Sequence, residues 1–440
     1  MRIKAVLMAF LCIPLAAEGG LLNAWEAAFQ RDAQYQRAFA ESDIGLEEEG
    51  IQRARLLPQI SATASVGKAT TETTRDGPIG VLTRVDRYDT MAWSIQFRQA
   101  LWRPSAFSGF QQGKALVRAA EANLAAAKQS LTLRLIENLA RLVEVESAYH
   151  LANQTAINQA KLSSQSAQLQ RVGQMTRADV SSARAKLARA NRDLLQAESV
   201  WRETQANWRL MVGDAFSEPN LDLRVIESIK SSTALKIDLI LAEARESNPV
   251  LRALREEIEA AKYESQRLRR ERLPTLDLYA SVSFNDSDTD NTIGTGFDTT
   301  RYGVQTNLPI FSGGALTAQI RQADARVRVA QAELNRFLEQ ANVLAARELV
   351  QLEQAKAQML LAKESLDSAK DQSRLVELGR KAGTTTLAEA VDAQLLLEQA
   401  RHESVLATTQ AVMVWARLHD LMGSLGDANV GLLATFVSFE

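Results

Sequence analysis

Apolar and polar residues alternate in four short runs of the chain, and the runs form two pairs. Residues 59–66 pair with 91–102, and residues 275–284 pair with 302–311, each across a loop rich in Thr, Asp and Gly. A period of two is typical of β-strands, and two such runs around a polar loop indicate a β-hairpin. The sequence therefore predicts two hairpins, over residues 59–102 and 275–311, with loops at 67–88 and 285–301.

Each predicted strand has one apolar face and one face of small polar residues. The polar faces carry residues such as Ser61, Thr63, Ser94 and Ser281. This pattern is typical of a membrane barrel with lipid outside and water inside, although periodicity alone fits a half-buried sheet on a soluble core equally well. The apolar faces hold Ile60, Ala62, Ala64, Val66; Met91, Trp93, Ile95, Phe97; Leu276, Leu278, Ala280, Val282, Phe284; and Val304, Thr306, Leu308.

Long Ala-rich helices are predicted on both sides of each hairpin. In the segment after residue 104, two series of residues spaced by seven, Leu124, Leu131, Asn138, Val145 and Leu135, Leu142, Tyr149, Ala156, indicate a coiled-coil seam. The rest of the chain thus offers coiled coil rather than a core for a sheet to cover, which favours the membrane interpretation of the hairpins. Helices are predicted over 21–56, 105–171, 177–212, 235–272, 315–380 and 387–422.

The same order of elements occurs twice, so the chain is predicted to be an internal duplication. Pro58 recurs as Pro274, and the glycine turn at Gly173 recurs at Gly383. The fold class is therefore mainly α with membrane β, built from duplicated helix–β-hairpin–helix units. The predicted parts are a first repeat over 18–213 with a turn at 172–176, a linker and equatorial region over 214–234, a second repeat over 235–423 with a turn at 381–385, and a C-terminal tail over 424–440.

The first residues have the pattern of a secretory signal peptide over residues 1–17. Arg2 and Lys4 precede an apolar run that ends at Leu15, and small residues follow. The apolar run is shorter than the ~20 residues that a membrane-spanning helix needs. The only cysteine, Cys12, lies in this segment. A cleaved chain would therefore hold neither a disulfide nor a cysteine-ligated metal.

Charge and motifs exclude several classes of function. The chain has 51 basic and 53 acidic residues, so no polyanionic partner such as nucleic acid is indicated. The histidines His150, His402 and His419 are isolated on predicted helices without ligands at metal spacing, which favours packing or surface roles. Gly294-Thr295-Gly296 lies in a hairpin loop and so is not a phosphate-binding turn. The sequence predicts no enzyme activity and no cofactor.

Four strands cannot close a barrel by themselves. Unpaired strand edges are not tolerated in lipid, because hydrocarbon offers no hydrogen-bond partners. Strands from several copies must then complete one barrel, and three copies would supply twelve.

Three motifs and the duplicated layout resemble the TolC family of outer-membrane efflux and secretion channels, over essentially the whole mature chain. The motifs are Leu273-Pro274-Thr275-Leu276-Asp277, Leu308-Pro309-Ile310-Phe311-Ser312-Gly313-Gly314, and Ala382-Gly383-Thr384-Thr385-Thr386-Leu387 followed by Val391-Asp392-Ala393. The resemblance implies a homotrimer, a twelve-stranded β-barrel in outer-membrane lipid, and a long α-helical coiled-coil tunnel across the periplasm. It also implies docking to a periplasmic adaptor and an inner-membrane transporter.

The resemblance also assigns residues near the helical turns. Glu389 and Asp392 match acidic positions that form the periplasmic constriction and select cations; they are three apart, hence on one helix face. An ordinary solvated helix face would show the same charges. Asp179, Arg380 and Thr385 match positions of the gate contacts between neighbouring hairpins. In the family, a basic residue and a tyrosine at these positions make the contacts that hold the channel closed. This chain has Thr385 in place of the basic residue and Arg380 in place of the tyrosine. Arg380 is therefore a candidate partner for Asp179.

The two hairpin tips match the part of the family that touches the adaptor. The tip residues are Val172, Gly173, Ala382, Gly383 and Thr384, although glycines of this kind also serve as ordinary helix C-caps.

The favoured function is a passive outer-membrane exit duct for a tripartite efflux pump or a type I secretion system. The alternative is a coiled-coil protein of the cell envelope that forms no pore. The two differ in the hairpin faces: arginine in place of Val282 or Ile95 should block membrane insertion of a duct and matter little otherwise, which membrane fractionation would measure. The cargo is not indicated by the sequence.

Overall fold

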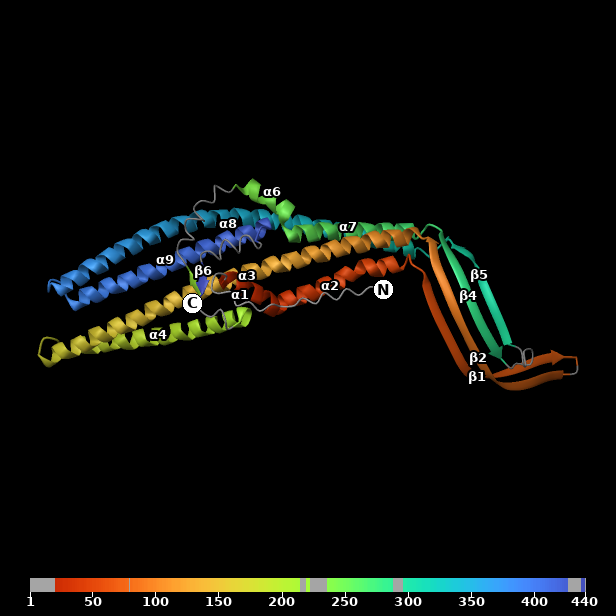
Figure 1. Cartoon of the computed structure of the whole chain (residues 1–440), viewed down its shortest axis with the longest axis horizontal. Coiled ribbons are helices and arrows are strands. Elements are labelled where there is room, and N and C mark those ends of the chain that lie inside the picture. The colour runs from red at the N-terminus through yellow and green to blue at the C-terminus, as the bar shows by residue number, and fades with distance from the viewer. Residues whose placement is uncertain are drawn as a thin grey trace, which may run out of the picture. The chain divides into compact units, whose positions relative to one another are not determined.

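The computed structural model describes residues 20–78, 80–213, 219–221, 236–287, 296–425 and 437–439 (Figure 1). The predicted signal peptide, residues 1–17, and most of the linker 214–234 and tail 424–440 lie outside the described residues. The chain divides into two compact units. The first comprises Met1–Phe39, Leu124–Pro249 and Leu338–Glu440, and the second comprises Ala40–Asn123 and Val250–Phe337.

The second unit contains one antiparallel sheet of four strands in the order β1-β2-β4-β5. The strands are β1 Gln59–Gly77, β2 Gly80–Trp102, β4 Thr275–Ser287 and β5 Gly296–Asn307. The pairing of β2 with β4 joins the hairpins of the two repeats into one sheet. The edges of the sheet are consequently β1 on one side and β5 on the other.

Strand register brings the apolar faces of all four strands together. Ile95 lies opposite Ala62 on β1 and opposite Val282 on β4. Trp93 pairs with Phe284, and their rings stack with centroids 6.3 Å apart. A shift of one residue in any pairing would move an entire set of side chains to the other face, so the match over both hairpins specifies this register.

The first hairpin extends well beyond the strands that alternation predicts. Residues 67–88 were predicted as loop, but β1 and β2 remain paired up to Gly77 and Gly80. Residues 67–88 are mostly polar and do not alternate, so the strand pattern disappears there although the backbone ladder continues. In the second hairpin the strands also run further than predicted, to Ser287 and from Gly296; residues 288–295 lie outside the described part.

The helices of the second unit pack closely on one another, and an ion pair joins them to the sheet. They are α7 Pro249–Arg270, most of α2 Ala33–Ala54, and the first parts of α3 Pro104–Arg171 and α8 Ala315–Lys381. Gly45 lies against Ala120 so closely that a Cβ at position 45 would come within 2.4 Å of the Ala120 Cβ. Arg103, where β2 passes into α3, donates to Asp277 of β4 at 2.6 Å.

Several arginines near the end of α7 form ion pairs or hydrogen bonds with other residues of the same chain. Arg267 pairs with Glu264 at 2.7 Å, and Arg269 pairs with Asp324 of α8 at 2.8 Å. Arg270 donates to Ser108 of α3 at 2.9 Å. These contacts tie three helices together next to the first residues of β4.

Two helices that were predicted as continuous are broken. The predicted helix 21–56 is α1 Gly20–Arg31 followed by α2, with Asp32 between them. The predicted helix 235–272 is α6 Ile237–Ser247 followed by α7, with Asn248 between them. Pro249 lacks an amide donor, which explains the second break. At the first, the Asp32 carboxylate accepts from the Tyr35 amide at 2.7 Å and restarts the helix.

The first unit is a helical assembly in which α4 Arg177–Val212 and α9 Leu387–Met422 pack with α1, α6 and the remaining parts of α3 and α8. Within it, Leu131, Leu135 and Leu142 of the predicted seam are buried. Tyr149 stacks on Trp201 of α4 with centroids 5.0 Å apart. Two short strands, β3 Pro219–Leu221 and β6 Val437–Phe439, pair antiparallel in this unit.

At each of these two helical breaks, the C-terminal end of another helix packs against the chain. After α4, Gly213 has a φ of 95° and lies against the Arg31 guanidinium; after α9, Gly423 has a φ of 78° and lies against the backbone of Asn248. The Asn248 side-chain amide donates to the Leu421 carbonyl at 2.9 Å. The two repeats therefore build the same joint, in which a helix ends on a broken helix.

The first joint is held by an ion pair. Arg134 of α3 donates two hydrogen bonds to the Asp32 carboxylate, at 2.9 and 3.0 Å. Burial raises the pKa of Asp32, but the hydrogen bonds from Arg134 and from the Tyr35 amide lower it more, so its pKa lies below the ordinary value.

The joint at Gly423 should not tolerate a side chain. A Cβ there would lie 2.5 Å from the Asn248 backbone, whereas a Cβ at Gly383, which has nearly the same φ of 77°, would meet nothing within 4 Å. Gly383→Ala should therefore cost only the left-handed strain, about 1 kcal/mol. Gly423→Ala should cost about 1–3 kcal/mol more from overpacking. Thermal unfolding of both variants, followed by circular dichroism, measures the difference, and equal melting temperatures would contradict the close contact.

Candidate functional site

The turn between α3 and α4 combines a helix C-cap with a helix N-cap. Gly173 has a φ of 78°; its amide donates to the Gln170 carbonyl at 3.0 Å, and the Gln174 amide donates to the Leu169 carbonyl at 2.9 Å. This pair of bonds is a Schellman motif. Thr176 and Asp179 then form a capping box, in which each side chain accepts from the backbone amide of the other.

The turn between α8 and α9 repeats this design. Gly383 has a φ of 77°, and the Thr384 amide donates to the Gly379 carbonyl at 2.9 Å. Thr386 and Glu389 form the second capping box. Because both turns have a C-cap glycine and a capping box in the same order, the two tips have the same local structure. The tip residues Val172, Gly173, Ala382, Gly383 and Thr384 are all exposed.

The second tip has additional anchors. The hydroxyl of Thr385 donates to the Val376 carbonyl at 2.9 Å, and the hydroxyl of Thr384 donates to the Gly379 carbonyl at 3.0 Å. Gly379 is required for this packing, because a Cβ there would lie 2.9 Å from the Thr385 side chain. Thr385, assigned by resemblance to a gate contact, is thus used within its own hairpin.

Glu389 is both an exposed carboxylate and part of the helix cap. Hydrogen bonds from the Thr386 amide, at 2.7 Å, and from its hydroxyl lower the pKa of Glu389, so the carboxylate is ionised at neutral pH. Asp392 lies exposed one turn further along α9. The structure thus places the two acidic residues near the second tip on one helix; their role in a constriction stays a prediction.

The two charged residues predicted for a gate contact are engaged within their own hairpins. Arg380 donates to Glu377 with two hydrogen bonds of 2.8 Å. The Asp179 carboxylate accepts from the Thr176 hydroxyl and amide, and these bonds lower its pKa. An Arg380–Asp179 contact between neighbouring hairpins stays a prediction, and it would have to compete with these local partners.

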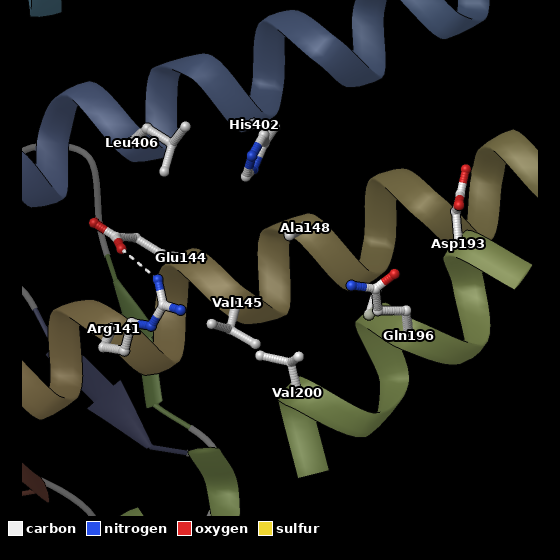
Figure 2. Close-up of a pocket in the computed structure, with 10 residues that line it drawn as sticks. Arg141, Glu144, Val145, Ala148, Asp193, Gln196, Val200, His402 and Leu406 are labelled. Carbon is white, nitrogen blue, oxygen red and sulfur yellow. Dashed lines mark ion pairs between the residues drawn. The ribbon is translucent and has the colours of Figure 1, made fainter. Parts of the chain in front are cut away.

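A groove that the sequence did not indicate lies between α3, α4 and α9, with a volume of about 410 Å³. Figure 2 shows Glu144 turned toward Arg141 on the same helix, with 3.6 Å between their charged atoms. Glu144 also accepts from the Thr409 hydroxyl at 2.8 Å. The groove is lined by residues of three helices that are distant in sequence: Arg141, Glu144, Val145, Ala148; Asp193, Gln196, Ala197, Val200; and His402, Leu406.

The histidine of this groove packs between helices. His402 Nδ1 lies 3.1 Å from the Ser147 hydroxyl, so it bridges α9 and α3. Burial lowers the pKa of His402, which favours the neutral imidazole, although the charges of Glu144 and Glu403 oppose this. The geometry agrees with a packing role for His402.

A second half-buried titratable group lies at the end of α9. Burial raises the pKa of Asp420 to about 6, and the negative charge of Glu137 on α3 adds to this rise. Glu137 itself accepts from Arg417, one turn before Asp420, at 2.9 Å. The sequence pattern did not reveal this group, because its surroundings include α3, a helix distant in sequence.

Comparisons with known proteins show the family to which the chain belongs. A sequence profile of the family described as "Outer membrane efflux protein" matches residues 25–214 and 240–424. This chain belongs to the outer membrane efflux protein family. The matched segments include both hairpins and both tips.

Relatives of this outer membrane efflux protein align over nearly its whole length. The alkaline protease secretion protein AprF of Pseudomonas aeruginosa is 26% identical over 96% of this chain and 88% of its own. The proteases secretion protein PrtF of Dickeya chrysanthemi is 27% identical over 99% and 96%. The crystal structure of the outer membrane protein VceC of Vibrio cholerae has the same fold, with a TM-score of 0.70, 19% identity and coverage of 92% and 96%.

The outer membrane efflux protein is therefore an export channel of the outer membrane with a large periplasmic portion. The relatives and the structural neighbour are secretion and outer-membrane proteins rather than enzymes. Among the described helices, none is long and apolar enough to cross a membrane.

Asp420 should make the stability of the helical unit depend on pH. The unfolded carboxyl, with its ordinary pKa of 3.8, loses its proton before the folded one, so stability should fall as the pH rises from about 4 to about 6. Asp420→Asn removes this cost and should stabilise the protein by up to about 3 kcal/mol at pH 7.5, with little effect at pH 4.

Melting temperatures at both pH values test this, with Glu403→Gln, an exposed acid on the same helix, as the control. A gain for Asp420→Asn that is equal at both pH values would rule out ionisation as the cause.

Proposed function

We propose that the chain is the exit duct of a type I secretion system, which passively conducts cargo received from an inner-membrane transporter and its periplasmic adaptor. The observation that carries this proposal is the end-to-end similarity to two proteins named for protease secretion. The same names favour a polypeptide cargo over a small molecule. A drug-efflux role is the second candidate, because the family is described by efflux.

The duct is a homotrimer in this proposal. One copy supplies four strands with unpaired edges at β1 and β5, and such edges cannot stay open in lipid. Three copies would close a twelve-stranded barrel by pairing β5 of each copy with β1 of the next. Away from the helix end of the sheet, the shared apolar face of the four strands would then meet outer-membrane lipid. The face with Ser61, Ser94 and Ser281 would line the lumen.

The helices continue this duct as a periplasmic tunnel, and the two tips meet the adaptor. Tip residues Val172 and Gly173, and Ala382, Gly383 and Thr384 of the second tip, are exposed and held by capped turns. A rigid, exposed turn suits docking, because little conformational freedom is lost on binding. This favours the duct over the alternative of an envelope protein without a pore, for which the repeated tip structure has no evident use.

The constriction lies close to the second tip in this proposal. Glu389 and Asp392 from three copies would form two carboxylate rings, which attract cations and exclude anions. The capping hydrogen bonds keep Glu389 ionised and hold its position. Removal of Glu389 thus removes a charge and also weakens a helix cap, so an experiment must separate the two effects.

Single-channel conductance of the purified protein in a planar bilayer tests this function. We expect small, cation-selective steps from the parent. Glu389→Ala combined with Asp392→Ala should abolish the cation selectivity. Thr386→Val removes the hydroxyl that bonds to Glu389 but retains both charges, so it should retain selectivity.

Each other result has a defined meaning. Conductance with an unchanged double variant would leave the duct standing and reject the constriction. If Thr386→Val loses selectivity as well, the cap rather than the charge is responsible. A protein that shows no conductance and is also extracted from cells without detergent would favour the envelope protein without a pore.

A further inference from the structure

The two most exposed large apolar side chains of the described chain are adjacent. Ile310 and Phe311 are 92% and 88% exposed, and they lie between the end of β5 and the start of α8. Gly313 and Gly314 follow with φ of 61° and 82°, and the Ala318 amide donates to the Gly314 carbonyl at 3.0 Å. These bonds and turns hold the connection in a defined course into α8. The exposed pair is thus a built feature at the foot of one sheet edge.

A second exposed apolar patch lies at the foot of the opposite edge. Ile51 near the end of α2, Leu57 in the connection, and Ile60 at the start of β1 are 54%, 48% and 71% exposed. They lie along the chain on both sides of the point where it leaves α2 and enters the edge strand β1. Each edge of the sheet therefore carries an uncovered apolar group next to the helices.

Chain direction decides what these two patches can meet. β1 runs away from its helix α2, and β5 runs back toward its helix α8, so both feet lie at the helix end of the sheet. The edges are separated by β2 and β4 within one copy, so the feet belong to opposite sides of the sheet. An antiparallel pairing of β5 with β1 of a second copy would bring unlike feet together, once at every junction of a closed ring.

We propose that Ile310 and Phe311 of one copy pack on Ile51, Leu57 and Ile60 of the next copy, forming an apolar clip at the foot of each subunit junction. This inference rests on the proposed homotrimer and adds the residues that hold it at the helix end. The occupant is a second copy rather than lipid, because the clip continues the line of the unpaired β5 and β1 edges. The clip excludes water from the place where the strand pairing ends.

Cysteine pairs test the clip directly, because the only native cysteine, Cys12, lies in the predicted signal peptide. Phe311→Cys combined with Leu57→Cys, and separately with Ile51→Cys, tests two positions of the clip, and a disulfide forms only where the two Cα atoms come within about 7 Å. On mild oxidation, at least one pair should give covalent dimers and trimers that disappear on reduction.

The control pair is Phe311→Cys with Phe107→Cys. Phe107 is also exposed, by 51%, but it follows the interior strand β2 rather than an edge, so no crosslink between copies is expected. Phe311→Ser should in addition lower the fraction of trimer in detergent, measured by native mass spectrometry, whereas Phe107→Ser should not.

The outcomes separate the clip from the trimer. A parent protein that is trimeric, with neither pair crosslinked, would overturn the clip and leave the proposed duct intact. A parent that is not trimeric in detergent or in membranes would overturn both. A spin label on Phe311→Cys in proteoliposomes should be shielded from oxygen and from a water-soluble relaxation agent; strong exposure to oxygen would identify lipid as the occupant and reject the clip.

Discussion

Backbone hydrogen bonding in the outer membrane is the constraint on which the rest of this structure depends. Hydrocarbon supplies no donors or acceptors, so every amide and carbonyl of a spanning strand needs a partner within the protein. In one copy only β2 and β4 have neighbours on both sides. The β2–β4 pair joins the two hairpins and leaves one outer edge each on β1 and β5. In the proposed barrel these two edges need strands from other copies.

The two repeats use the same local structures at equivalent places in their helices. Both repeats turn at a glycine in the left-handed conformation, restart at a capping box, and end on the break of an earlier helix. The residues that stabilise equivalent positions differ in part between the two repeats. Asp179 and Glu389 cap their helices in the same way, whereas the first joint uses the Asp32–Arg134 ion pair and the second uses the Asn248 side chain.

Sequence patterns predicted those features that depend on alternating apolar and polar residues or on a local turn. The strand faces around Ile95 and Val282 and the glycine turns at Gly173 and Gly383 are of this kind. They missed the long ladder before Asp89, because residues 67–88 are mostly polar and do not alternate. They also missed the break at Asp32, because a single polar residue does not end a helix pattern. The groove beside His402 and the burial of Asp420 arise from helices distant in sequence, so no local pattern reports them.

The two helical hairpins have nearly equal helix lengths, and this restricts the insertions and deletions that the fold can accept. α3 and α8 have 68 and 67 residues, and α4 and α9 have 36 each. Since α4 and α9 end on fixed joints, an insertion in α3 alone would displace Gly213 from Arg31 or shift the seam that buries Leu142. A longer or shorter helical hairpin therefore needs insertions or deletions in both of its helices that keep the apolar seam in register.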